Sequence, residues 1–426
     1  MTTPRWSKTV PRLRIAGFTS AFGNGATGVA LPIVLAVTFT GWQVGAVLAA
    51  LGLGMMYSFA RGGIEADRSH RVHQMIFFDV ARAAATAAIA AATLLPAATG
   101  WVLAAVCALI NGVSVGFYRP ALAAYWADVL DPPTRRAGLA SNALINRTGL
   151  AVGAATAGVF VAAHASVWVL VVDAATFAFG ALICVGLAEI ADRANQKMMD
   201  LRQSRIRRTK EFDLAANWRT IYTTLAIYPW LRSVISTSIL GSLFLAVCQV
   251  AAPLVLVEHY SGTEIALVQS LPVAFLFAGN LVARIGDPPV PGAWLATSLI
   301  TKPLSYLVIA LHLPAAIPAA LASTSSLTDA VNGPRLANTI AEGFHSADRG
   351  KVFGAQQGAG SLLAPIGLLL AGLATTVIRP EVLLFGAAAA LAALAVVPCG
   401  KSGFWHFRVD PAGTPDAAQL RQPANN

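Results

Sequence analysis

The sequence predicts an all-α membrane protein with about twelve transmembrane helices in two six-helix halves. Three observations support this class. The chain has 426 residues, of which 56% are hydrophobic and only 12% charged, a composition that excludes an ordinary water-soluble protein. Apolar stretches of roughly 17 to 25 residues, long enough to cross the hydrocarbon layer, recur along the chain. Because these stretches are continuously apolar and do not alternate, they indicate helices rather than membrane β-strands.

The predicted spans form two groups, separated by a hydrophilic segment. The first group comprises residues 15–39, 42–60, 75–95, 100–117, 139–162 and 167–187. The second group comprises residues 234–257, 265–282, 294–312, 315–331, 352–377 and 382–397. In the segment between them, Trp218, Ile221, Tyr222 and Leu225 recur at the spacing of a helix lying in the lipid headgroup layer.

These groups define the domain organisation. We expect an N-terminal tail (1–14), a first six-helix half (15–188), a basic central loop with an interfacial helix (189–232), a second six-helix half (233–398) and a disordered tail (399–426). The four cysteines fall singly in or at the ends of apolar stretches, which indicates helix packing and neither disulfides nor metal ligands: Cys107, Cys184, Cys248 and Cys399.

The basic residues follow membrane topology. Lys and Arg gather before the first span and in the second-to-third and fourth-to-fifth loops, whereas turns 40–41, 96–99, 163–166 and 258–264 contain none. The positive-inside rule therefore predicts that both termini are cytoplasmic, in a multi-pass cell membrane protein. This pattern and contacts with membrane lipids explain the net charge of +10 without a nucleic-acid partner.

Two spans carry stripes of polar and small residues. In the first span, Gly17, Ser20, Asn24 and Thr27 share one helical face, which either packs against a neighbouring helix or lines a water-filled cavity. In the fifth span, a second stripe lies beside Arg147 and consists of Asn142, Asn146, Gly149 and Gly153.

Charged side chains inside spans require a reason, because an isolated one costs roughly 2.5 to 3.5 kcal/mol at the bilayer centre. Asp173 in the sixth span is either a structural or protonated aspartate, or a proton or substrate site. We hypothesise that Arg147 or Lys302 pairs with an acidic group across a cavity. Gln249 and Gln357 add further polar points to that candidate cavity.

A polar hinge connects the second and third spans. It contains Gly63, Asp67, Arg68 and Arg71, and the next helix continues with Asp79 and Arg82. Basic residues in a short loop can simply hold that loop in the cytoplasm. The order of the residues gives G-x-x-x-D-R-x-x-R followed by D-x-x-R, which is a more specific pattern.

This pattern resembles the same loop in the major facilitator superfamily, and more narrowly its macrolide-efflux and enterobactin-exporter branch. Further resemblances lie at 20–24, where Asn24 replaces the usual carboxylate, around Asp173, and at 332–336 and 348–354. The resemblance implies two halves of inverted three-helix repeats around a midplane cavity. It also implies a monomer without cofactors that exports a small, partly hydrophobic molecule, such as a drug, antibiotic or siderophore, in exchange for protons across a bacterial cytoplasmic membrane.

The resemblance also implies a gating role for the hinge. Asp67 would contact the start of the eleventh helix, near Lys351 and Val352, and close the cytoplasmic side in the outward-open state. A carboxylate at a helix N-terminus contributes roughly 0.3 to 1 kcal/mol, which biases such an equilibrium without locking it. Arg68 and Arg71 would add ion pairs, with Asp128 as one candidate partner.

Two other functions use the same observations. Uptake by a symporter or metabolite transporter of this fold remains an alternative. A membrane enzyme is the remote one, because no histidine, cysteine or carboxylate cluster has ligand spacing. The absence of a G-x-x-x-x-G-K-[ST] loop argues against direct coupling to ATP. We therefore expect no catalytic and no metal site, with the histidines scattered at His70, His73, His164, His259, His312, His345 and His406.

Overall fold

The computed structural model describes residues 6–68, 70–129, 132–206, 229–283, 290–343, 352, 356, 359–401 and 403–407. This part of the chain contains twelve α-helices and no strands. The first half consists of α1 (Trp6–Thr38), α2 (Gly41–Arg68), α3 (Arg71–Ala92), α4 (Ala97–Val129), α5 (Pro132–Ala162) and α6 (Ser166–Ile206). The second half consists of α8 (Pro229–His259), α9 (Gly262–Val282), α10 (Pro291–Ala310), α11 (Ala316–Gly343), α13 (Ala364–Ala374) and α14 (Pro380–Cys399).

The surface of these helices is that of a membrane protein. Among the described residues, nine helices are long and apolar enough to cross a bilayer. Large apolar side chains such as Phe77, Leu182 and Val396 are each about two-thirds exposed, which suits contact with lipid and not with water. The predicted all-α membrane class is confirmed, and each predicted span overlaps one helix.

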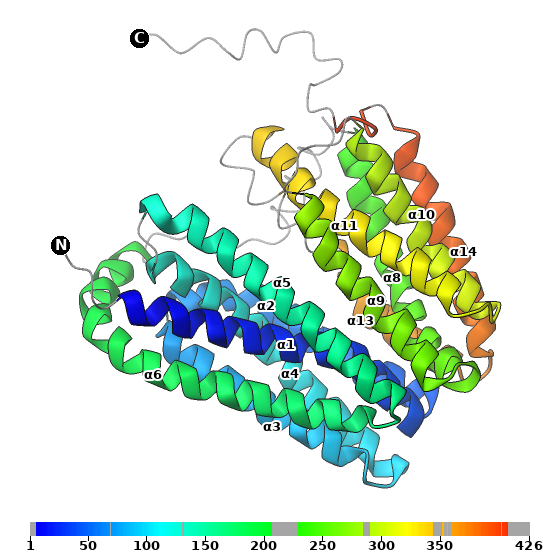
Figure 1. The fold of residues 1–426 in the computed structure, drawn as a ribbon, viewed down its shortest axis with the longest axis horizontal. Helices are drawn as coiled ribbons and strands as arrows, with labels where there is room; N and C mark the ends of the chain where they lie inside the picture. Colours follow the sequence, from blue (N-terminus) through cyan, green and yellow to red (C-terminus); the bar gives the residue numbers. More distant parts are fainter. Residues whose placement is uncertain are drawn as a thin grey trace.

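The helices form two bundles that follow the two halves of the chain (Figure 1). In the first bundle α1 packs on α5 and α6, and α3 packs on α4 and α6; in the second, α11 packs on α9 and α10, and α8 on α14. Helix α6 continues to Ile206, so the first part of the expected central loop is helical. The expected interfacial helix around Trp218 lies outside the described residues.

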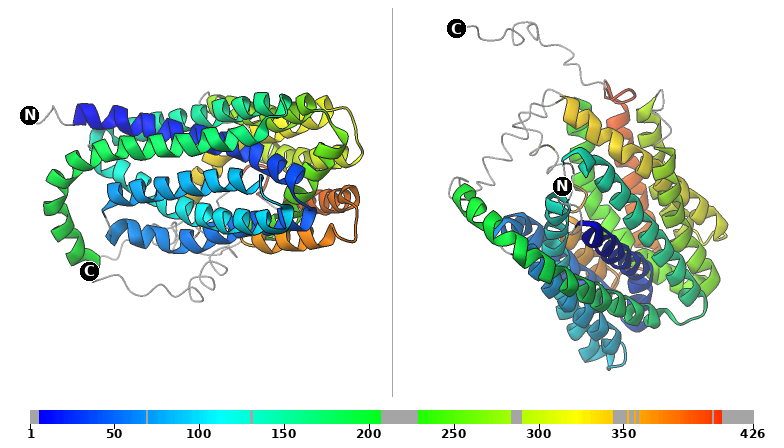
Figure 2. Two further views of the ribbon diagram at one scale, coloured as in Figure 1. Left: turned by 90° about the horizontal axis from the view of Figure 1, so that it is seen from below. Right: turned by 60° about the vertical axis from the view of Figure 1, so that its left-hand side comes forward.

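Among the described residues, the two bundles share a buried core at one end of the molecule. We call the end where α1 finishes and α14 starts, at the lower right of Figure 1, the far end, and the end where α1 starts and α14 finishes the terminal end. Figure 2 shows the same two bundles from two further sides. Toward the far end, one buried cluster joins both halves and includes Val44, Leu48, Val250 and Leu368. Toward the terminal end each half has its own buried cluster, built around Met75 and Trp126 in the first half and around Trp230, Ile235 and Ile340 in the second.

A seam of small residues lets α2 and α13 touch at the far end. A Cβ atom added at Gly45 would stand 2.6 Å from the Cα atom of Gly372. One turn earlier, Gly41 lies against the side chain of Thr375. Small residues allow helix backbones to approach this closely in a membrane. The two halves are therefore packed together at the far end and have separate cores at the terminal end.

Candidate functional site

A cavity of about 660 Å³ opens in the first half, with Leu276 of α9 contributing from the second. Helices α1, α3, α4 and α5 form its walls. Seven of the residues singled out in the sequence line it: Gly17, Ser20, Asn24, Arg82, Asn142, Asn146 and Arg147. Arg119 and the aromatic side chains of Tyr118 and Trp126 complete one side of the wall. The cavity lining therefore combines polar and apolar side chains.

Arg82 is the centre of a buried polar cluster in the cavity wall. Its guanidinium donates hydrogen bonds to Ser20 Oγ at 3.3 Å and to Asn24 Oδ1 at 2.5 Å, so the polar face of α1 both binds α3 and lines the cavity. It also forms an ion pair with Asp79, at 3.6 Å, and lies 3.7 Å above the ring of Phe177. All these contacts lie inside the bundle, because Arg82 is only 2% exposed.

Asp173 belongs to the same cluster. Its carboxylate accepts hydrogen bonds from Thr27 of α1 and from Thr176 of its own helix, and it interacts electrostatically with Arg82. Gly23 makes room for this carboxylate: a Cβ atom at Gly23 would stand 1.9 Å from Asp173 Oδ1. The sequence placed Asp79 and Arg82 with the hinge. In the structure Arg82 lines the cavity, and the two carboxylates of Asp79 and Asp173 are buried behind it.

The charges in this cluster do not balance when all its groups are ionised. Asp79 and Asp173 are 0% and 1% exposed, and they share one guanidinium. A net negative charge at this depth in a membrane is costly, whereas a single added proton makes the cluster neutral. One proton on either carboxylate would balance the charges of these three groups, and Arg119 adds a further positive charge near Arg82.

The second stripe divides into two parts. The Asn142 and Asn146 amides face Gly17 of α1, and their Oδ1 atoms are buried without a hydrogen-bond donor among the described residues. Further along α5, Gly149 and Gly153 pack against the α1 backbone. Asn142 and Asn146 thus line the cavity, whereas Gly149 and Gly153 join α5 to α1.

Arg119 and Arg147 differ from Arg82 in having no partner. Both line the cavity, yet neither forms an ion pair or hydrogen bond within the described part of the chain. An unpaired arginine within a membrane bundle must face water or a ligand. These two side chains therefore give the cavity a surplus of positive charge.

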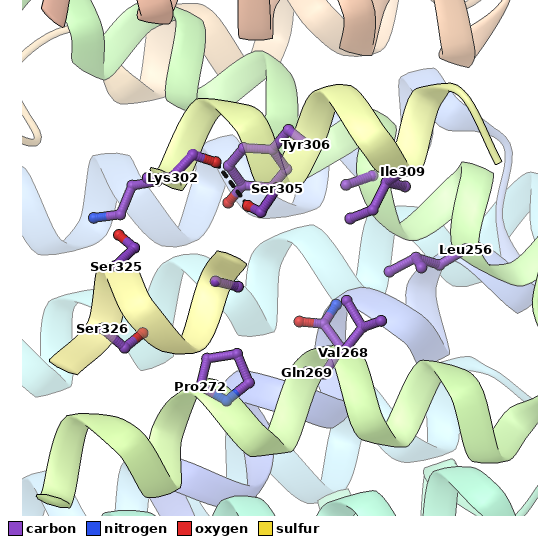
Figure 3. Close-up of a pocket in the computed structure, with 12 residues that line it drawn as sticks. Leu256, Val268, Gln269, Pro272, Lys302, Ser305, Tyr306, Ile309, Ser325 and Ser326 are labelled. Atoms are coloured by element: carbon purple, nitrogen blue, oxygen red, sulfur yellow. Dashed lines mark hydrogen bonds between the residues drawn. The ribbon is translucent and has the colours of Figure 1, made fainter. Parts of the chain in front are cut away.

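A smaller cavity of about 170 Å³ lies in the second half, between α8, α9, α10 and α11. Figure 3 shows Lys302 and Tyr306 from α10 and Gln269 from α9 around it. Lys302 forms an ion pair with Asp329 at 2.6 Å, and Ser298 donates a hydrogen bond to the same carboxylate. The partner of Lys302 thus comes from the adjacent helix α11. Asp329 was missed, although it is the only acidic residue in the predicted span 315–331.

The remaining expected site residues have different outcomes. Arg71 is buried at the start of α3, and Gln249 is exposed on α8, where it lines neither of the two cavities. The side chains of the other five lie outside the described residues, so their assigned roles stay predictions: Gly63, Asp67, Arg68, Asp128 and Gln357.

The expectation that the histidines are scattered is wrong for two of them. His259 ends α8 and His312 lies in the turn after α10, and their ring centroids are 3.8 Å apart. His259 Nε2 is also 3.1 Å from Glu381 Oε1, at the start of α14. Sequence spacing could not reveal this cluster, because helix packing brings three distant segments together.

Comparisons with known proteins agree with this architecture. A sequence model described as "Major Facilitator Superfamily" matches residues 13–331. No curated protein matches the chain. Among solved structures, a mutant of the nucleoside transporter NupG has a TM-score of 0.66 at 14% identity, covering 92% of this chain and 98% of that one. The xylose transporter XylE from E. coli, in an inward open conformation, has a TM-score of 0.62 at 13% identity, covering 93% and 96%.

Proposed function

The chain belongs to the Major Facilitator Superfamily, and from this premise we propose that it exports a small, partly hydrophobic organic anion in exchange for protons. The observation that carries the proposal is the cluster of Asp79, Arg82 and Asp173, whose charge is balanced by one proton. Arg82 lines the cavity and interacts with both carboxylates, so their protonation can be coupled through Arg82 to what the cavity holds.

The cavity lining supports the class of substrate. Arg119 and Arg147 provide two unpaired positive charges, and Asn142 and Asn146 provide amides for hydrogen bonds. Trp126 and Leu276 add apolar surface. An arginine binds a carboxylate or phosphate through paired charge-assisted hydrogen bonds. A small molecule that combines an apolar body with an acidic group fits this lining.

The packing of the halves supports alternating access. The positive-inside pattern assigns the terminal end to the cytoplasm. With the far ends packed and the terminal ends separate, this conformation would load substrate from the cytoplasm. Rocking of the halves would then expose the cavity to the far side. Export as the direction is supported by the resemblance of the hinge and of the Asp173 segment to efflux proteins.

Transport into inverted membrane vesicles tests the proposal. Vesicles with the chain would receive labelled aromatic carboxylates, and a pH gradient would acidify their interior. We expect accumulation that depends on the gradient and that vesicles without the chain do not show. Release driven by the same gradient would instead identify a symporter that works in uptake. Equal fluxes with and without the gradient would contradict proton coupling.

A further inference from the structure

The far end of the second half carries a group of metal-ligating side chains that the transport mechanism does not use. The ligand atoms of His259, His312 and Glu381 all lie within 4.8 Å of one another. Two imidazoles and one carboxylate are the ligand set with which proteins bind zinc while leaving a fourth position open. Both histidines are exposed at the surface, so a cation can reach them from the aqueous phase.

The backbone holds these side chains together. Tyr260, directly after His259, donates a hydrogen bond from its hydroxyl to the Leu313 carbonyl oxygen at 2.7 Å, which ties the end of α8 to the turn after α10. His312 in that turn has a φ of 54°, a left-handed conformation in which glycine is the usual residue. A histidine here costs conformational energy, and the conformation places its ring against that of His259.

The Glu381 carboxylate gives a second, independent observation in favour of a bound cation. One carboxylate oxygen, Oε1, contacts His259 at 3.1 Å and Arg379 at 3.2 Å. The other, Oε2, is buried and accepts no hydrogen bond from any described residue. A buried carboxylate oxygen without a partner is destabilising, and a bound cation would satisfy it.

We propose that His259, His312 and Glu381 form a binding site for a divalent first-row metal ion of the zinc type. Ligand atoms around tetrahedral zinc are about 3.3 Å apart, as follows from metal-ligand bonds of 2.0 to 2.1 Å. His259 and Glu381 are 3.1 Å apart, close to this separation, and no ligand atom of the three residues lies more than 4.8 Å from another. The three ligands come from α8, α14 and the turn after α10, so a bound ion would stiffen the far end of the second half.

Arg379 determines how the site can be tested. The Arg379 guanidinium forms an ion pair with the Glu381 carboxylate, and the Arg379 side chain is 77% exposed. A metal ion would compete with this positive charge for the carboxylate. The substitution Arg379→Gln should therefore tighten metal binding, whereas the same change would weaken a cluster that served only as an ion-pair network.

The experiment is calorimetric titration of the purified full chain, without a polyhistidine tag, with zinc chloride. His312→Asn should weaken zinc binding by at least about tenfold, the loss that even outer-shell changes cause, and Arg379→Gln should strengthen it. His164→Asn is the matched control, since His164 has a φ of 55° in the turn after α5 and belongs to no such group among the described residues. Equal zinc affinities of the native chain and His312→Asn, or weaker binding in Arg379→Gln, would overturn the proposal.

Discussion

Gly23 of α1 and Asp173 of α6 are packed so closely that a Cβ atom on the glycine would stand 1.9 Å from the carboxylate oxygen. This contact seats the buried aspartate beside Arg82 and fixes the spacing of two helices.

The substitution Gly23→Ala should therefore destabilise the protein by about 1 to 3 kcal/mol, as overpacking of a buried site does. The methyl group must displace Asp173 or push α1 away from α6. Gly28→Ala, on the same helix, is the matched control, because nothing lies within 4 Å of an added Cβ there. Thermal unfolding of the detergent-solubilised variants checks the difference, and equal melting temperatures of the two would contradict it.

Asp173→Asn should uncouple transport from protons. The amide leaves Arg82 with a single carboxylate, Asp79, so the cluster is neutral without an added proton. Exchange of labelled for unlabelled substrate should continue, whereas a pH gradient should no longer accelerate transport. Thr27→Val removes a hydrogen bond from the same carboxylate and keeps its charge, so it should retain the gradient effect. A gradient effect that persists in Asp173→Asn would mean that another group binds the transported proton.

Arg147→Gln should weaken binding of the acidic substrate by roughly 10- to 100-fold, which corresponds to the loss of a charged hydrogen bond of about 1.5 to 3 kcal/mol. Arg147→Lys keeps the charge and should lose less. The exposed Arg61, whose guanidinium lies against Tyr57 and not in the cavity, provides the control Arg61→Gln. Binding measurements with a carboxylate and its methyl ester separate the charge effect from other losses. An equal loss for both compounds would mean that Arg147 does not bind the acid group.

A disulfide between the halves should lock the far end. An added Cβ at Gly41 lies 2.8 Å from the Cβ of Thr375, about 1 Å closer than in a disulfide. After a shift of that size, Gly41→Cys combined with Thr375→Cys should cross-link on mild oxidation. Transport should stop and return after reduction, while each single variant should be insensitive to oxidation. Full transport by the oxidised double variant would mean that the halves do not separate there.

The same cross-link tests the predicted hinge. If Asp67 closes the cytoplasmic side, Asp67→Ala should favour the conformation with packed far ends. The cross-linked fraction at early times should rise by roughly two- to fivefold, as expected for an interaction of about 0.3 to 1 kcal/mol. An unchanged rate of cross-linking would contradict a gating role for Asp67.

The sequence predicted the fold because length and apolarity determine a membrane span. It singled out Ser20, Asn24 and Asn146 through their spacing on helices and Arg147 as a charge inside a span, and all four line the cavity. It could not predict which helix faces meet. Arg82 follows the hinge in the chain, yet its partners come from α1 and α3 together. Contacts between separate segments, such as Lys302 with Asp329, depend on packing angles that no local pattern encodes.

Where Gly45 meets Gly372, main chain lies against main chain. Even a methyl group at either position would have to push the two backbones apart. The tightness with which the far side can be sealed is therefore limited by two positions that accommodate no side chain at all.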